Sequence, residues 1–253
     1  MQKYYHYYDK SYEKFTPDWF DKTNLVKINQ FLTENSESLI TFIEKYEEQF
    51  NLPRSIFQNK EILVAGCGFG GLCRYLEKRG AIVTGIDVSS LAIIGAKEIA
   101  KLNQTSCEFK VADLTEESDL GLFDFIFDDH LLHCLTTASD RDKYLKNIAQ
   151  HLKQDGLCFI ESMAFHTGIQ VPVEYRFDED HILWKNLNST EVMTRKIAPS
   201  IEIENEVKQS GLNINYLYYH SELSFQAFAE YNDYPFQFLP KTIRLTCSPA
   251  KTI

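Results

Sequence analysis

The stretch that decides the fold is EILVAGCGFGG, which spans Glu61–Gly71. Its apolar run, Ile62–Ala65, predicts a buried strand. The glycines that follow predict a tight turn into a helix. Glycine suits such a turn because it adopts backbone dihedrals that other residues avoid and lets a ligand approach the backbone closely. The glycines concerned are Gly66, Gly68, Gly70 and Gly71.

The next strand is predicted in AIVTGIDVSS, Ala81–Ser90, where the apolar segment Ile82–Ile86 ends at Asp87. A carboxylate in this place accepts hydrogen bonds from the two hydroxyls of a ribose. The interval from Gly66 to Asp87 fits one strand–turn–helix–strand unit. We therefore expect the chain to bind a cofactor that contains a nucleoside.

Two further predicted strands, each followed by acidic residues, narrow the choice of cofactor. The segment Cys107–Val111 leads into Ala112-Asp113-Leu114, and Leu122–Phe127 leads into Asp128-Asp129-His130. Together with the glycine turn, this pattern resembles the class I S-adenosylmethionine-dependent methyltransferases over roughly residues 56–250. The resemblance implies an α/β fold, with a Rossmann-like, doubly wound sheet of seven strands whose last strand is antiparallel.

The resemblance also implies a cofactor and its contacts. In that family the glycine loop contacts the amino-acid part of the cofactor. The acid after the second strand holds the ribose, and the acid after the third meets the adenine amino group. The implied cofactor is S-adenosylmethionine, with S-adenosylhomocysteine as its product. The implied contact residues are Gly66, Cys67, Gly68, Gly70, Asp87, Val88, Asp113, Leu114, Asp128 and Asp129.

The chain departs from the family pattern at one position. The family often has an acid just before the first glycine, where this chain has Ala65. Contact with the ammonium group of the cofactor would then fall to backbone carbonyls or to another side chain. Asp128 and Asp129 are expected to face the cofactor and acceptor amines, unless one of them caps the helix that follows.

Two histidines are the candidate catalytic residues. The segment DDHLLHCL (Asp128–Leu135), followed by Asp140-Arg141, resembles a bacterial subgroup of small methyltransferases. Ligands of open parallel sheets lie beyond the carboxyl ends of the strands, which is where His130 and His133 are expected. Histidine titrates near neutrality, so His130 is predicted to act as a base or to orient the acceptor.

Each histidine also has a structural alternative. The ring of His130 would pack against the cofactor or bond a backbone carbonyl, and His133, one helical turn later, would be a buried core residue. Glu161, near the end of a predicted fifth strand, is a further candidate. A metal site built from Asp129, His130 and His133 lacks the HExxH spacing, so no metal is expected.

The remaining elements follow from apolar periodicity. Residues 1–55 are expected to be a helical segment, with a second helix ended by Pro53. Residues 56–253 are expected to be the cofactor-binding domain, with an inserted hairpin or lid at residues 165–200. A helix is predicted from Ser139-Asp140 to Asp155-Gly156, and another is bracketed by Pro199 and Gly211. The last predicted strands are Leu157–Met163, Asn213–Tyr219 and Thr242–Cys247.

The first 20 residues are unusually rich in tyrosine and phenylalanine. In the methyltransferases that this chain resembles, an N-terminal segment with tyrosines commonly closes over cofactor and substrate. The alternative is that these rings cover an apolar edge of the domain.

The composition of the chain indicates its domain size and its expected location in the cell. At 253 residues, with 44% hydrophobic and 25% charged residues, the chain fits one globular α/β domain with additions. No apolar run is long enough to span a membrane, and the N-terminal sequence lacks the apolar core of a secretory signal. The six cysteines include no CxxC pair, which favours reduced thiols and a cytoplasmic location.

The net charge of the chain indicates which kinds of partner it is expected to bind. The formal net charge is −10, and no third of the chain carries an excess of Lys and Arg. Proteins that grip a phosphate backbone need a cationic face. We therefore expect no nucleic-acid partner and a small-molecule acceptor such as an amine, a phenol or a thiol. The sequence leaves the oligomeric state open.

The predicted function is transfer of a methyl group to a nitrogen, oxygen or sulfur atom of a small molecule by in-line displacement. One alternative is an NAD-dependent oxidoreductase, because Gly66, Gly68 and Gly71 also satisfy the dinucleotide fingerprint. That alternative gives no role to Asp113 or to the antiparallel pair of strands at the end. A second alternative is a non-catalytic cofactor-binding subunit of a partner enzyme.

Overall fold

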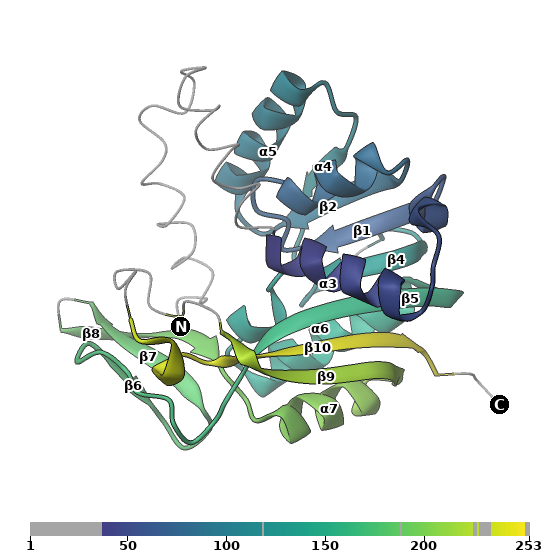
Figure 1. Ribbon diagram of the computed structural model, residues 1–253. Coiled ribbons are helices and arrows are strands. Elements are labelled where there is room, and N and C mark those ends of the chain that lie inside the picture. Colours follow the sequence, from purple (N-terminus) through teal and green to yellow (C-terminus); the bar gives the residue numbers. More distant parts are fainter. Residues whose placement is uncertain (1–36, 118, 188, 225–226, 228–233, 251–253) are drawn as a thin grey trace.

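The computed structural model describes residues 37–117, 119–187, 189–224, 227 and 234–250 (Figure 1). The aromatic stretch of the first 20 residues lies outside the described residues. The first described helix, α3 (Glu37–Gln49), confirms the predicted second helix of the N-terminal segment. It ends four residues before Pro53, which instead precedes the short 3-10 helix η2 (Arg54–Phe57).

A seven-stranded sheet in the order β3-β2-β1-β4-β5-β10-β9 organises the molecule. The first five of these strands pair in parallel, and β10 is antiparallel to both of its neighbours. This arrangement confirms the predicted fold class. The strands are β1 (Glu61–Ala65), β2 (Ile82–Asp87), β3 (Glu108–Val111), β4 (Phe123–Asp128), β5 (Leu152–Ala164), β9 (Leu212–Ser224) and β10 (Lys241–Pro249).

Helices cover both faces of this sheet. The side chains of β1 alternate between the two cores that lie on these faces. Ile62 and Val64 point into a core with α3, α4 (Gly71–Lys78) and α5 (Ser90–Asn103). Leu63 and Ala65 point the other way, into a core with α6 (Ala138–His151) and α7 (Ser200–Gln209). Successive residues of a strand face opposite sides, so one apolar run supplies two cores.

The boundary between α6 and β5 differs from the prediction. The helix ends at His151, not at Asp155-Gly156, and β5 begins at Leu152. Leu152 pairs with Phe123, and the register then shifts so that Phe125 pairs with Leu157. The polar residues between Leu152 and Leu157 therefore lie in a bulge. Their turn-like sequence was a misleading signal because the pairing with β4 decides the structure.

The insertion at residues 165–200 contains one strand more than a hairpin. A small antiparallel sheet is formed by β6 (Tyr175–Phe177), β7 (Ile182–Leu187) and β8 (Thr190–Lys196). A third apolar cluster, which includes Met163 at the end of β5, Leu183 and Ile197, joins it to the main sheet. The insertion therefore begins where β5 leaves the carboxyl edge of the parallel strands (Figure 1).

Candidate functional site

The turn after β1 has the left-handed backbone that its glycines predict. The φ angles of Gly66, Gly68 and Gly70 are +71°, +48° and +74°. A Cβ atom on Gly70 would lie 2.6 Å from the ring of Phe109, so no other residue fits there without displacing that ring. The turn is tied to β2 by the bond from the Cys67 N–H to the carbonyl of Ile86, at 2.9 Å.

Asp87, at the end of β2, faces this turn. Its Oδ2 accepts a hydrogen bond from the Gly68 N–H at 3.0 Å, and its Oδ1 accepts one from the Ser89 N–H at 2.9 Å. Two backbone donors therefore fix the orientation of this carboxylate next to the glycines. Val88 is half-buried beside it, and the Ser89 hydroxyl accepts from the Ala92 N–H at the start of α5.

Asp113 lies at the same edge of the sheet, because Val111 at the end of β3 is in register with Asp87. One oxygen of the Asp113 carboxylate accepts from the N–H and the hydroxyl of Thr115, at 2.8 and 2.7 Å. Leu114 is buried, and its carbonyl accepts from the side chain of Asn147 on α6. The predicted ribose and adenine acids are thus neighbours across two adjacent strands.

The two acids after β4 differ in their surroundings. Asp128 is fully buried, and its carboxylate accepts from the N–H groups of Leu131 and Leu132 at the start of the 3-10 helix η3 (Leu132–Cys134). Asp128 therefore caps η3, as one predicted alternative had it. Burial raises its pKa to about 7 against the opposing effect of these N–H groups.

Asp129 is half-buried and stays beside the glycine turn. Its N–H donates to the carbonyl of Ala65 at 3.0 Å, which continues the pairing between β4 and β1. Burial, together with the negative charges of Glu161 and Asp87, raises the pKa of Asp129 to about 6, although His130 opposes this.

His130 adopts a left-handed backbone, with φ +65°, which is uncommon for a residue other than glycine. Its Nε2 lies 2.9 Å from Oε1 of Glu161, and a quarter of its side chain is exposed. Burial lowers the pKa of His130. The hydrogen bond to Glu161 and the negative charges of Glu161, Asp129 and Asp128 outweigh burial, so the net pKa is raised.

His133 has opposite properties. It is 3% exposed, and its Nδ1 accepts a hydrogen bond from the N–H of Met163 at 3.4 Å. Burial and the positive charges of His130, Arg195 and Arg141 hold its pKa well below the usual range. His133 is therefore a neutral ring in the core, 6.0 Å from the ring of His130.

One residue of the site was missed by the sequence analysis. Arg244 on β10 lies opposite Glu161 in the strand register, and its Nε donates to Oε2 of Glu161 at 2.5 Å. An arginine inside the otherwise uncharged predicted strand Thr242–Cys247 is the signal that could have identified it.

Cys67 lies in the glycine turn, between Gly66 and Gly68. Burial and the neighbouring Cys73 raise the pKa of Cys67 well above that of a free thiol, so Cys67 is not an activated nucleophile.

Within the described ranges, no group of three or more His, Cys, Asp or Glu side chains could hold a metal ion. No helix among the described residues is long and apolar enough to cross a membrane.

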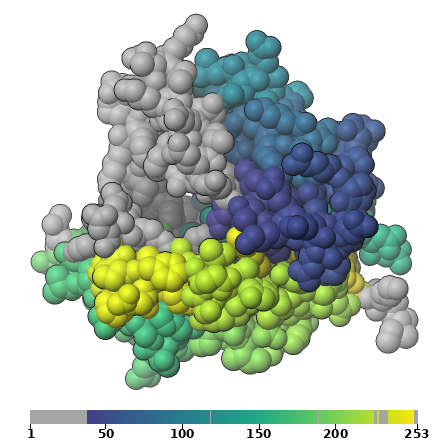
Figure 2. Space-filling view, in the orientation of Figure 1, coloured from purple at the N-terminus to yellow at the C-terminus, as the bar shows by residue number. Residues whose placement is uncertain are grey.

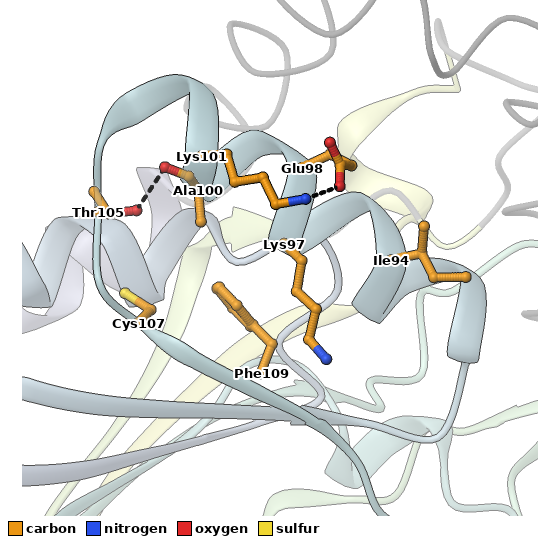
Figure 3. Close-up of a pocket in the computed structure, with 8 residues that line it drawn as sticks. All are labelled: Ile94, Lys97, Glu98, Ala100, Lys101, Thr105, Cys107 and Phe109. Atoms are coloured by element: carbon orange, nitrogen blue, oxygen red, sulfur yellow. Dashed lines mark hydrogen bonds and ion pairs between the residues drawn. The ribbon is translucent and has the colours of Figure 1, made fainter.

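A cavity of about 340 Å³ opens between α5 and β3 (Figure 3). Lys97 and Lys101 of α5 border it together with Cys107 and Phe109 of the neighbouring strand region. None of the predicted site residues lines this cavity. The ring of Phe109, which lines this cavity, also lies against Gly70 of the glycine turn.

Comparison with known proteins gives the following relatives. Residues 63–160 match the family model described as a methyltransferase domain. A protein of Geobacillus sp. (strain WCH70), named as a candidate methyltransferase, is 31% identical over 153 residues, which cover 60% of this chain and 57% of the relative. The ubiquinone biosynthesis O-methyltransferase of Pelagibacter ubique (strain HTCC1062) is 28% identical over 157 residues, which cover 61% and 63%. The chain thus spans less than two thirds of the length of these relatives.

A solved structure agrees in fold. It is that of a Burkholderia thailandensis 1,6-didemethyltoxoflavin-N1-methyltransferase with bound 1,6-didemethyltoxoflavin and S-adenosylhomocysteine. The TM-score is 0.59 at 13% identity, and the alignment covers 99% of this chain and 92% of that one. The matched domain begins in β1 and ends in β5, so it contains the glycine turn and the acids after three strands. Over residues 63–160 the chain is therefore similar to the methyltransferase domain family, and the chain shares the fold of the Burkholderia methyltransferase structure.

Proposed function

We propose that this chain is an enzyme that transfers the methyl group of S-adenosylmethionine to a hydroxyl group of a small molecule. The observation that carries the proposal is the meeting of the glycine turn, Asp87, Asp113, Asp129 and His130 at one edge of the sheet. The name of the Pelagibacter relative, an O-methyltransferase, supports oxygen over nitrogen and sulfur as the acceptor atom.

The residues at this edge fit the cofactor. The left-handed glycines of the turn carry no side chains that would keep the amino-acid part away from the backbone, and the Asp87 carboxylate is already oriented beside them. Val64 and Ala65, the last residues of β1, carry no charge. We assign the contact with the cofactor ammonium to Asp129, because Asp128 is buried and its oxygens are bonded to η3.

S-adenosylmethionine, when bound, supplies a sulfonium methyl group that is already a strong electrophile. The task of the chain is to hold the acceptor in line with that methyl group and to exclude water, which is worth about 7–11 kcal/mol in favourable cases. A hydroxyl acceptor must also lose its proton, and His130, whose imidazole is a quarter exposed at this edge, is the proposed base.

The proposed reaction takes place in a single step. Bound S-adenosylmethionine would supply its methyl group in a direct displacement by the acceptor oxygen, and the sulfur would keep the electron pair of the broken bond. The acceptor proton passes to the imidazole of His130, and solvent takes it up after product release. We assign His133 a packing role, which its burial and its bond from the Met163 N–H support.

The small insertion β6–β8 is proposed as the cover on the acceptor side, since it begins where β5 ends. The proposal has no place for a nucleic-acid partner, in keeping with the formal charge of −10. A cytoplasmic location is proposed as well. It is supported by the six cysteines, which are all free thiols, as expected in a reducing compartment.

Calorimetric titration tests the choice of cofactor. Wild-type protein should bind S-adenosylhomocysteine and should not bind NADH. Asp87→Ala should weaken the binding of S-adenosylhomocysteine by about 2–4 kcal/mol, because a charge-assisted bidentate contact is lost. Asp142→Ala, which removes an exposed acid on α6, is the matched control and should bind as the wild type does. Tight NADH binding without a response to S-adenosylhomocysteine would favour the oxidoreductase alternative.

Methyl transfer by the isolated chain separates the enzyme from a non-catalytic subunit. Incubation with S-adenosylmethionine and a panel of phenols, amines and thiols should give S-adenosylhomocysteine with an acceptor that carries a hydroxyl group. Turnover that appears only after a second protein is added would support the partner-subunit alternative.

A further inference from the structure

A chain of three charged or titratable side chains runs from β10 through β5 to the loop after β4. Arg244 donates to one oxygen of Glu161 at 2.5 Å, and the other oxygen of Glu161 lies 2.9 Å from Nε2 of His130. Glu161 is 0% exposed and Arg244 is 2% exposed. Of these three side chains, it is His130, at the end of the series, that reaches the surface of the site.

We propose that Glu161 and Arg244 are positioning residues that fix the tautomer and the orientation of the His130 ring for proton removal from the acceptor. The inference rests on the proposed function. Glu161 accepts from the Nε2–H of the ring, and Arg244 holds Glu161 in the rotamer that does so. Proton exchange with the acceptor then runs through Nδ1, the other ring nitrogen.

Arg244 is itself firmly anchored. Its Nη2 donates to the carbonyl of Ser38 at 2.9 Å, and its guanidinium lies 5.3 Å from the centre of the Phe42 ring. Both residues belong to α3, which packs against β9 and β10 in the region where dark purple meets yellow in Figure 2. The carboxylate of Glu161 is therefore bound from a side that cannot shift without moving α3.

The backbone of His130 is fixed independently of its ring. The residue before it is bonded to Ala65, and the carbonyl of His130 accepts from the thiol of Cys134 at 3.3 Å. Uncommon backbone conformations that the surroundings hold in place cluster at functional sites. With the backbone held in this way, the bond to Glu161 determines which ring nitrogen carries the proton.

A packing role alone does not account for this arrangement. Taking a carboxylate and a guanidinium out of water is costly, and apolar side chains of similar size usually stabilise a core as well or better. Arginine–carboxylate pairs frequently use both carboxylate oxygens on the arginine. Glu161 instead divides its oxygens between Arg244 and His130.

The charged groups around His130 set the expected response to pH. Glu161 faces the ring from β5, Asp128 and Asp129 from the end of β4, and His133 from η3, while Arg244 lies beyond Glu161. The three acids raise the pKa of His130, and Glu161 adds a hydrogen bond. Removal of the Glu161 charge should therefore lower the pKa of His130.

Glu161→Gln gives a prediction specific to the positioning role. An arginine cannot accept a hydrogen bond, so the amide oxygen of the substituted side chain must face Arg244 and its NH₂ group must face His130. Nε2 of His130 then has to accept, and its proton moves to Nδ1. The nitrogen chemical shifts of ¹⁵N-labelled histidine, measured without cofactor, should report this change of tautomer together with a lower pKa.

The same variant should change kinetics in a defined way. At neutral pH its kcat should fall about 10-fold or more, but not beyond the roughly 10²–10⁴-fold expected for loss of the base itself. The acidic limb of the kcat profile should move to lower pH. Affinity for S-adenosylhomocysteine should change less than about twofold, because Glu161 touches His130 and not the glycine turn.

Two further variants keep the test decisive. In the double variant Glu161→Gln/Arg244→Met the amide is released from Arg244 and carries no buried charge, so its oxygen can turn to His130 and restore the Nε2–H tautomer. Glu222→Gln is the matched control, because Glu222 bonds His220 on β9 and not His130. It should leave the His130 spectrum unchanged.

Unchanged nitrogen shifts and an unchanged pH limb in folded Glu161→Gln would overturn the positioning role. A tautomer change in the double variant as large as in the single variant would overturn the part assigned to Arg244. Both outcomes are distinct from failure of the proposed function, which would appear as a lack of S-adenosylhomocysteine binding while the histidine spectra stayed interpretable.

Discussion

Two arginine–glutamate pairs lie on opposite faces of the sheet, and they differ in how the carboxylate is used. On the α6 side, Arg141 donates through Nε and Nη2 to the two oxygens of Glu206, at 2.9 and 2.5 Å. On the α3 side, Glu161 gives only one oxygen to Arg244 and the other to His130.

This difference is the basis for assigning a structural role to the first pair and for the positioning role proposed for the second. In the Arg141 pair, both carboxylate oxygens of Glu206 accept hydrogen bonds from the arginine. Nη1 of Arg141 donates to the carbonyl of Leu132 and so links α6 to the 3-10 helix η3. In the Arg244 pair the carboxylate also contacts His130, a quarter of whose side chain is exposed. Two similar side-chain pairs can thus be told apart by the third partner of the carboxylate.

The largest effect is expected at His130. His130→Ala removes the proposed base, so kcat should fall roughly 10²–10⁴-fold while affinity for S-adenosylhomocysteine stays near the wild-type value. The wild-type rate should also fall at acidic pH, as the imidazole takes up a proton before the acceptor can donate one. Steady-state kinetics and calorimetry provide the two measurements. A large loss of cofactor affinity with an unchanged pH profile would move His130 from catalysis to binding.

The structural pair should behave differently. Arg141→Met leaves Glu206 without its partner and the Leu132 carbonyl without a donor, so the free energy of unfolding should fall by about 2–4 kcal/mol. Because no part of this pair reaches His130, kcat of the folded variant should change less than about threefold. Urea denaturation and kinetics test both halves. A kcat loss as large as that of Glu161→Gln would break the distinction between the pairs.

The smallest effect is expected at Asp128, the buried acid at the end of β4. Burial raises its pKa from the ordinary 3.8 to about 7. The folded state therefore holds the proton more tightly than the unfolded chain, and this contribution is present below about pH 4 and lost as the pH rises through about 7. Asp128→Asn keeps a neutral acceptor for the N–H groups of η3.

The stability of Asp128→Asn relative to the wild type should consequently be greater at pH 8 than at pH 5. Calorimetric melting at the two pH values tests this, with Asp142→Asn as the exposed control. A relative loss of stability at pH 8 would mean that the bonds from Leu131 and Leu132 require the ionised carboxylate.

Local patterns were enough to predict the sheet and the place of the glycine turn and Asp87 within it. The apolar run of β1, the glycines after it and Asp87 are all signals within one supersecondary unit, and each of them was confirmed in position. The end of α6 was wrong because the bulge in β5 depends on pairing with β4. The third strand of the insertion, Thr190–Lys196, was missed because its sequence TEVMTRK has two adjacent apolar residues and no strict alternation of polar and apolar positions.

The partner of Glu161 could not be predicted from the sequence for a similar reason. Arg244 is 83 positions away, and only the register of the antiparallel β5–β10 pair brings the two together. The different roles of Asp128 and Asp129 were equally hidden. They depend on which carboxylate turns toward η3, and adjacent acids give the same local signal.

Native mass spectrometry of the purified chain tests the central claim, cofactor binding at the glycine turn, most directly. The wild-type protein should carry, or take up on addition, one S-adenosylhomocysteine or S-adenosylmethionine, and Asp87→Ala should lose that mass while Asp142→Ala retains it. A retained NAD mass, or no mass change at a saturating concentration of S-adenosylhomocysteine, would contradict the account.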